Sequence, residues 1–218
     1  MRTAAWIVVA GVAIAAVGVA RAQQEKLASP AMDQAKQGAM DPAMQAAMEK
    51  MKVLGAPSEG HKALEPLIGS WSYTAQFWMQ PDSQPETMTG SVVNTLIFGG
   101  RFLKQEFSGT AMAEGQPPFE GLGILGFDNI RKEYQTVWFD NMSTSMMRGA
   151  GQFDASTSTL SDSGDFSCPV TGESHRWYRS AWTVTDANHT TYESYSRTPE
   201  GREFKSMEIH YTRTGTSS

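Results

Sequence analysis

The chain of 218 residues is 40% hydrophobic and 19% charged, and it carries a formal net charge of −5. This acidic balance argues against sequence-independent binding of nucleic acids, which needs clustered lysine and arginine. The single cysteine, Cys168, excludes an intrachain disulfide, a zinc site with four thiolate ligands and a Cys-x-x-Cys redox pair.

Residues 1–22 have the features of a secretory signal peptide. Arg2 supplies a positive charge, and an apolar run follows from Ala4 to Ala20. Ala20-Arg21-Ala22 then places small residues at the two positions that signal peptidase inspects. We expect cleavage after Ala22, a periplasmic or secreted protein, and no membrane span after cleavage. A retained membrane anchor is the alternative, because the apolar run approaches the ~18 residues that span a bilayer.

Residues 23–40 are polar, rich in alanine and glutamine and free of aromatics, which predicts a flexible linker. A short helix and a connector are predicted over 41–60, since Asp41-Pro42 is a good helix start and Gly55 a good stop. Met40 lies just before this helix, and Met44, Met48 and Met51 follow at spacings of four, four and three. Copper ligation by their thioethers is one interpretation. We favour apolar packing on a barrel mouth or on a partner, because no histidine or cysteine joins the stripe.

Residues 61–214 are predicted to form one β-rich domain, followed by a short tail over 215–218. The first strand shows period-two alternation, with one face made of Trp71, Tyr73, Ala75, Phe77 and Met79. The other strand-like runs cover about 87–98, 101–109, 119–127, 132–140, 144–153, 158–166, 176–185, 189–198 and 203–213. Turn residues such as Gly99-Gly100 and Asp128-Asn129 separate several of them.

About ten strands with short connections and no helical crossover predict an all-β fold with antiparallel neighbours. Closing such a sheet removes its unpaired edges. We therefore expect a closed up-and-down antiparallel barrel, with a β-sandwich as the alternative.

The ends of this segment resemble the lipocalin and calycin barrels. Gly69-Ser70-Trp71 opens the first strand as their Gly-x-Trp motif does, and Arg213 ends the last strand where they commonly place an arginine over the tryptophan. The resemblance implies that Trp71 plugs one end of the barrel, that Gly69 lets the chain pass close beneath it, and that Arg213 covers the indole.

More specifically, the segment from about His61 to Arg213 resembles the bacterial domain-of-unknown-function family 1579 (DUF1579). The matching stretches are His61-Lys62-Ala63-Leu64, Gly69-Ser70-Trp71, Gly99-Gly100-Arg101-Phe102-Leu103, Pro118-Phe119-Glu120-Gly121, Gly126-Phe127-Asp128-Asn129, Tyr134 with Trp138-Phe139-Asp140, and Met207-Glu208-Ile209-His210-Tyr211-Thr212-Arg213. This resemblance implies a calycin-like barrel and no established activity.

No metal site or cofactor is expected. The histidines lie far apart in the sequence and show no metal-ligand spacing: His61, His175, His189 and His210. Haem-binding barrels use a histidine near the C-terminus, but the alternation of Met207, Ile209 and Tyr211 turns His210 outward.

A candidate binding cavity is predicted from residues that share inward-facing phases. On one strand the alternating positions are Tyr134, Thr136, Trp138 and Asp140. In the alternative phase Val137 and Phe139 face inward, and the carboxylate faces solvent. Asn94 would add a polar group, and Arg148 on the following strand could pair with Asp140. The full predicted ligand-binding set is Tyr73, Phe77, Asn94, Tyr134, Trp138, Asp140, Arg148 and Met207.

We expect the barrel to bind a small apolar or amphipathic molecule, with no catalytic residues assigned. Two alternatives stay open: a hydrolase or isomerase using Asp140 as a base, and a structural or interaction module with a filled interior. Cys168 is interpreted as an unreactive thiol, with a reactive thiol or a dimer link as alternatives, so a homodimer also stays open.

Overall fold

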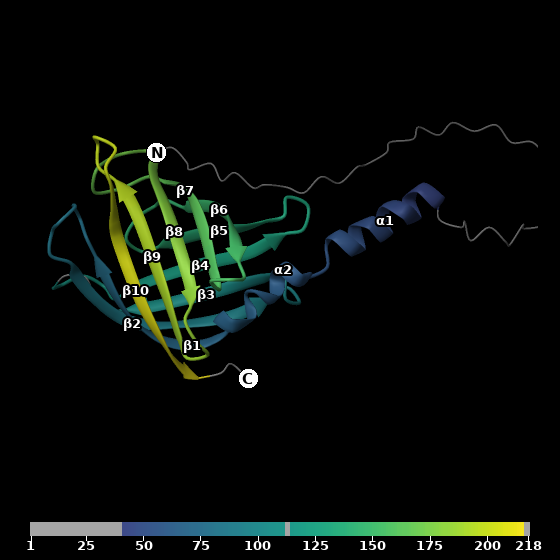
Figure 1. The fold of residues 1–218 in the computed structure, drawn as a ribbon, viewed down its shortest axis with the longest axis horizontal. Coiled ribbons are helices and arrows are strands. Elements are labelled where there is room, and N and C mark those ends of the chain that lie inside the picture. The colour runs from purple at the N-terminus through teal and green to yellow at the C-terminus, as the bar shows by residue number, and fades with distance from the viewer. Residues whose placement is uncertain (1–40, 112–113, 216–218) are drawn as a thin grey trace, which may run out of the picture. The chain divides into compact units, whose positions relative to one another are not determined.

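The computed structural model describes residues 41–111 and 114–215, and within them the fold is a closed barrel of ten antiparallel strands (Figure 1). Each strand pairs with its neighbour in sequence, and the last pairs back onto the first. The strands are β1 (Gly69–Phe77), β2 (Glu86–Ile97), β3 (Phe102–Gly109), β4 (Phe119–Asp128), β5 (Glu133–Asp140), β6 (Met147–Asp154), β7 (Thr159–Phe166), β8 (Arg176–Val184), β9 (His189–Arg197) and β10 (Glu203–Gly215). The predicted up-and-down barrel is confirmed, and the sandwich alternative was wrong.

Alternation along β1 explains how the barrel interior is filled. Trp71, Tyr73 and Ala75 are buried, while the residues between them face outward. Met79 does not continue this face as expected, because β1 ends at Phe77 and Met79 is 55% exposed. On β10, Ile209 and Tyr211 are buried in the same way.

Three short helical elements precede the barrel: α1 (Pro42–Leu54), α2 (Glu59–Lys62) and a 3₁₀ turn, η1 (Glu65–Leu67). The predicted helix corresponds to α1, and the amide of Gly55 donates to the carbonyl of Met51 at its end. No residue of α1 is buried, and Met44, Met48 and Met51 are 46–69% exposed. The expected packing of these methionines on the barrel mouth is therefore not found, because the helix presents them to solvent.

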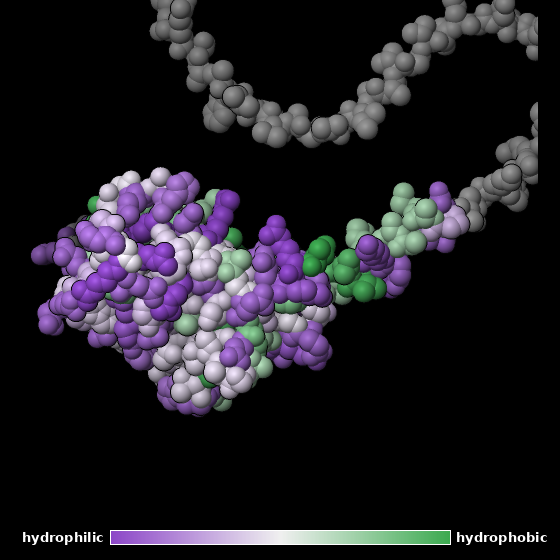
Figure 2. All heavy atoms as spheres, turned by 45° about the horizontal axis from the view of Figure 1, so that its top comes forward, coloured by the Kyte–Doolittle hydropathy of each residue, from purple (hydrophilic) through white to green (hydrophobic). Residues whose placement is uncertain are grey.

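The predicted signal peptide and linker lie outside the described residues. Within residues 41–111 and 114–215, every helix is too short or too polar to cross a membrane. In Figure 2 the visible face of the barrel is mostly hydrophilic, while hydrophobic side chains gather on α1. The exposed apolar residues of α1 are Met44, Met48, Met51 and Val53.

One end of the barrel, called here the closed end, is covered by residues 57–68. Leu64 and Leu67 from this segment are 0% and 3% exposed. They pack in a cluster with four barrel residues: Leu103, Leu125, Tyr134 and Leu160. Burying two leucines stabilises this cover by several kcal/mol, at roughly 1.5–3 kcal/mol for each side chain.

Trp71 and Arg213 pack together at the closed end, as their resemblance to the calycin barrels implied. Trp71 is 1% exposed, and its indole N–H donates to the carbonyl of Leu67 at 2.9 Å. The guanidinium carbon of Arg213 lies 4.0 Å from the centroid of the Trp71 ring. Arg213 also donates to backbone carbonyls, namely those of Ile68, Pro66 and Ala187. Gly69 has a φ of 122°, which a side chain rarely allows, so glycine suits this crossing of the chain.

Candidate functional site

The barrel holds a cavity of about 270 Å³ between the closed end and the opposite rim. The inward-facing residues of almost every strand line it, because alternation turns every second side chain of a strand to the interior. The rim is formed by the ends of β1, β3 and β5 and the starts of β2, β4 and β6. Lining residues reach this rim at Phe77, Phe119, Asp140 and Met147, so the cavity extends away from the closed end.

Nine of the residues that line the cavity are aromatic. The ring of Trp138 makes an edge contact with Phe107 at 5.0 Å between centroids and stacks on Phe119 at 6.2 Å. On the opposite side Trp182 stacks on Tyr211 at 5.4 Å. These contacts give the cavity largely apolar aromatic walls, in which each stacked pair covers one face of both of its rings.

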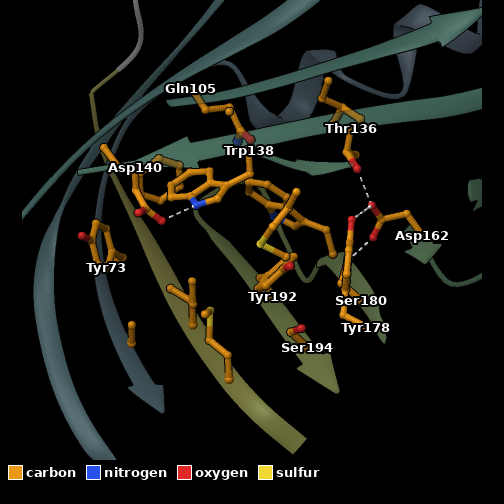
Figure 3. Close-up of a pocket in the computed structure, with 18 of the residues that line it drawn as sticks. Tyr73, Gln105, Thr136, Trp138, Asp140, Asp162, Tyr178, Ser180, Tyr192 and Ser194 are labelled. Carbon is orange, nitrogen blue, oxygen red and sulfur yellow. Dashed lines mark hydrogen bonds between the residues drawn. The ribbon is translucent and has the colours of Figure 1, made fainter. Parts of the chain in front are cut away.

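Asp140 holds Trp138 in place at the rim. The indole N–H of Trp138 donates to Asp140 Oδ2 at 2.8 Å (Figure 3). The amide of Met142 donates to Asp140 Oδ1 at 2.9 Å. The phase of β5 is therefore the one that turns Trp138 and Asp140 inward. The alternative phase, with Phe139 inside, was wrong, since Phe139 is 38% exposed.

Five of the eight predicted binding residues line this cavity: Tyr73, Phe77, Trp138, Asp140 and Met207. These residues lie on β1, β5 and β10. Strand pairing and closure of the barrel place all three strands around the same interior.

The other three predicted residues do not line it. Asn94 is buried at the closed end, where its amide donates to the carbonyl of Leu67 at 2.8 Å. Tyr134 also lies there, and its hydroxyl donates to the carbonyl of Gly60 at 2.6 Å. Arg148 is exposed, because Met147 and Gly149 take the inward positions of β6. The expected pairing of Arg148 with Asp140 is therefore not formed.

A buried carboxylate that the sequence analysis missed lies deeper in the cavity. Asp162 on β7 is 7% exposed. Its Oδ2 accepts hydrogen bonds from Thr136 at 2.5 Å and from Tyr178 at 3.3 Å, and its Oδ1 accepts one from Ser180 (Figure 3). We call Asp162 with these three hydroxyl residues the Asp162 cluster.

Gly149 on β6 makes room for the Asp162 cluster. A Cβ atom at this position would lie 2.3 Å from the Tyr178 hydroxyl and 2.4 Å from Asp162 Oδ2. Contacts this short force neighbouring atoms to move. The absence of a side chain at Gly149 is thus a condition for the observed hydrogen bonds.

The tyrosines of the cavity are held in the protonated form. Burial, with the nearby charge of Asp162, raises the pKa of Tyr178 well above its usual value and that of Tyr192 to about 12. Burial alone raises the pKa of Tyr73 to about 12. At neutral pH these phenols therefore act as neutral hydrogen-bonding groups.

The histidines do not gather at the cavity. His210 is on the outer face and bonds to Glu208, as its predicted phase requires. His61 is buried at the closed end, where its Nδ1 accepts the amide proton of Ser58 at 2.9 Å. Among the described residues, no three His, Cys, Asp or Glu side chains come together as metal ligands would.

Cys168 lies in the loop between β7 and β8 and is partly buried. Burial alone would raise the pKa of its thiol, but hydrogen bonds from Thr171 and Val170 and the charge of Arg176 outweigh it, so the pKa is lowered. In the sequence no cation is adjacent to this thiol, which favoured the unreactive interpretation. Arg176 is eight positions further along the chain, and the loop brings its charge near.

The family model described as "Protein of unknown function (DUF1579)" matches residues 56–213, from the connector after α1 through nearly all of β10. The chain belongs to the DUF1579 family. The resemblance stated from the sequence is thereby confirmed. Among curated proteins, none matches this DUF1579 chain significantly.

Several solved structures are similar to this DUF1579 chain. The crystal structure of Rv2717c from M. tuberculosis matches with a TM-score of 0.57 and 19% identity, over 73% of this chain and 99% of that one. The S-type phycobiliprotein lyase CPES from Guillardia theta matches with a TM-score of 0.49 and 11% identity, over 76% and 98% of the two chains. A de novo designed fluorescence-activating β-barrel matches with a TM-score of 0.38 and 13% identity, over 70% and 97%. At these identities the first match supports the barrel fold and nothing further.

Proposed function

We propose that this DUF1579 protein binds a small apolar or amphipathic molecule inside its barrel. The observation that carries the proposal is the cavity of about 270 Å³ with aromatic walls. A cavity of roughly 150 Å³ holds benzene, and drug-sized ligands occupy roughly 300–1,000 Å³. The interior therefore suits a molecule with one or two rings. A module stabilised only by a filled interior would have side chains in this space.

A polar group inside the cavity supports the same proposal. Tyr211 is 3% exposed and lines the cavity, and within the described residues no hydrogen bond to its hydroxyl is formed. Every fully buried side-chain nitrogen or oxygen of the described residues has a hydrogen-bond partner, so a hydroxyl without one keeps some access to the cavity. This hydroxyl is thus available to a ligand or to water, while the rings around it contact the apolar part of the ligand.

We further propose that the protein acts after export, with residues 1–22 removed as a signal peptide. Mass spectrometry of the protein purified from its native host tests this. The expected mature chain begins at Gln23 and is found in the periplasmic or secreted fraction. An intact N-terminus in a membrane fraction would contradict the proposal.

Binding can be tested with N-phenyl-1-naphthylamine, a neutral aromatic dye whose fluorescence rises in apolar surroundings. We expect saturable binding of one dye per chain. Ser194→Phe should weaken it by about tenfold or more, because Ser194 is buried, lines the cavity, and the added ring takes up its space.

Thr191→Phe is the matched control, since it adds the same ring to β9 at a position outside the cavity lining. Its affinity for the dye should equal that of the unmodified protein. Absence of saturable binding, or equal binding by the Ser194→Phe variant in its folded form, would refute the proposed function.

A further inference from the structure

The charges that line the cavity have one sign. Two carboxylates face it, Asp140 at the rim and Asp162 deeper inside. No lysine, arginine or histidine is among the cavity-lining residues, all of which lie within the described chain. An anionic ligand would be repelled by this interior, because charges interact strongly where water is excluded.

Asp162 has no cationic partner in the described residues. Its neighbours in the Asp162 cluster are the hydroxyls of Thr136, Tyr178 and Ser180, which are neutral donors. Asp165, three positions further along β7, faces outward and pairs with His175 instead. A carboxylate that is 93% buried without a countercharge is unfavourable unless something else compensates its charge.

The Asp162 cluster leaves one acceptor position free. A carboxylate offers about four lone-pair sites. Thr136 and Tyr178 both donate to Oδ2, so two sites there are used, while Oδ1 accepts only from Ser180. The remaining site on Oδ1 can accept one more N–H or O–H donor from a molecule in the cavity.

The aromatic walls add a second preference for a cation. Trp182 and Tyr192 line the cavity together with Asp162, and their ring centroids lie 5.8 Å apart in an edge-to-face contact. The face of an aromatic ring attracts a cation, and this attraction strengthens when the cation is removed from water.

From this arrangement we propose that the ligand is an amine: an apolar body of one or two rings that carries a primary or secondary ammonium group. The ammonium donates to the free site on Asp162 Oδ1 and supplies the countercharge that the Asp162 cluster lacks. The apolar body lies against Trp138 and Phe119 towards the rim. This inference rests on the proposed function and specifies its ligand class.

The test uses three naphthalene derivatives of nearly equal size: 2-naphthylmethylamine, 2-naphthylmethanol and 2-naphthoate. At neutral pH they are cationic, neutral and anionic. Isothermal titration calorimetry on the full chain should rank the amine first, about tenfold or more ahead of the alcohol, with the carboxylate last.

Variants assign the preference to the Asp162 cluster. In Asp162→Asn the amine should lose its advantage over the alcohol to within about threefold, while Asp165→Asn, which removes a charge from the outside of the same strand, should keep it. Should Asp162→Asn fail to fold, Thr136→Val serves instead. It removes one donor from the buried carboxylate and frees a second acceptor site, so the advantage of the amine should increase.

The outcomes separate this inference from the proposed function. If the alcohol binds saturably but the amine binds no better, the ligand class is wrong and the binding function stands. If the advantage of the amine survives in Asp162→Asn, or does not increase in Thr136→Val, the Asp162 cluster is not its site. If none of the three compounds binds, both the proposed function and this inference fail.

Discussion

At the scale of single residues, the Trp71–Arg213 contact joins the first strand to the last. A cation over tryptophan contributes about 0.5–2 kcal/mol, and the hydrogen bonds of Arg213 to backbone carbonyls add to it. We expect Trp71→Ala to lower the free energy of unfolding by roughly 3–5 kcal/mol, since a large buried ring leaves a cavity. A double-mutant cycle with Arg213→Ala, measured by denaturant unfolding, should show a coupling of at least about 0.5 kcal/mol.

The control is a cycle between Trp71→Ala and Arg179→Ala. Arg179 lies over the ring of Tyr195, a contact between β8 and β9 that does not involve Trp71. The effects of these two substitutions on the free energy of unfolding should add to within about 0.3–0.5 kcal/mol. A coupling between Trp71 and Arg213 no larger than this control would contradict the role of their contact.

His61 should make stability depend on pH. Burial, with the charge of Arg101, lowers the pKa of His61 below its ordinary value of 6.5. The Nδ1 atom accepts the amide proton of Ser58, which a doubly protonated ring cannot do. The unfolded chain therefore takes up this proton at a higher pH than the folded one. As pH falls from above 6.5 through the lowered pKa, the free energy of unfolding should fall.

Urea unfolding of the wild type and of His61→Gln between pH 8 and about 4.5 measures this contribution. Titrations of carboxylates common to both proteins cancel in the difference between the two curves. The wild type should lose more stability than the variant on acidification. Parallel curves for the two proteins would show that His61 is not responsible.

At the scale of elements, α1 should contribute little to barrel stability. None of the residues of α1 is buried. At its end the carbonyl of Leu54 accepts a hydrogen bond from the side-chain amide of Asn129, and the carbonyl of the next residue, Gly55, accepts one from Arg101. We expect a chain beginning at Ala56 to lose at most about 1–2 kcal/mol relative to one beginning at Asp41, as measured by urea unfolding. The family match also begins at residue 56.

A chain beginning at Gly69 is the control for this truncation. It lacks the cover of the closed end, including Leu64 and Leu67, and removing each buried leucine costs about 2–5 kcal/mol. This chain should be far less stable than the one beginning at Ala56. Similar losses in both truncations would mean that α1 carries part of the stability assigned here to residues 57–68.

Alternation let the sequence predict both the strands and their inward faces where one face is clearly apolar. On β1 the aromatic positions decide the phase, whereas on β5 both faces carry large apolar side chains, so the sequence favoured the inward phase of Trp138 without excluding the other. β7 gives no such contrast, because Ser161, Asp162 and Ser163 are all polar. Leu160 could have indicated the inward face of β7, since it is the apolar residue of this stretch and is buried. Asp162 lies two positions later on the strand and therefore on the same face.

Alternation predicts which face a residue takes but not how far along the barrel it lies. Asn94 and Tyr134 do face inward, yet they are at the level of the closed-end cover and bond to it. That level depends on the stagger between strands and on where residues 57–68 cross, which are long-range features. Arg148 was misplaced for a simpler reason, since the glycines of β6 conceal which of its faces is inside.

At the scale of the whole molecule, closure requires contacts between distant parts of the chain. Trp71 pairs with Arg213 across the β1–β10 ladder. All-β folds dominated by such non-local pairings fold in roughly milliseconds to seconds. We expect refolding from urea, followed by stopped-flow tryptophan fluorescence, in this range and independent of protein concentration. Refolding within microseconds would contradict the expectation that the barrel must close between β1 and β10 before the fold becomes stable.

Closure by β10 also sets when a newly made chain can become a barrel. During synthesis β1 emerges first, and the edge of β1 that does not pair with β2 stays unpaired until β10 has left the ribosome. This is because β10 pairs with both β1 and β9. Until then two strand edges are unpaired and open to association with other chains. A nascent chain with this topology therefore cannot cover both of these edges until nearly the whole of it has been translated.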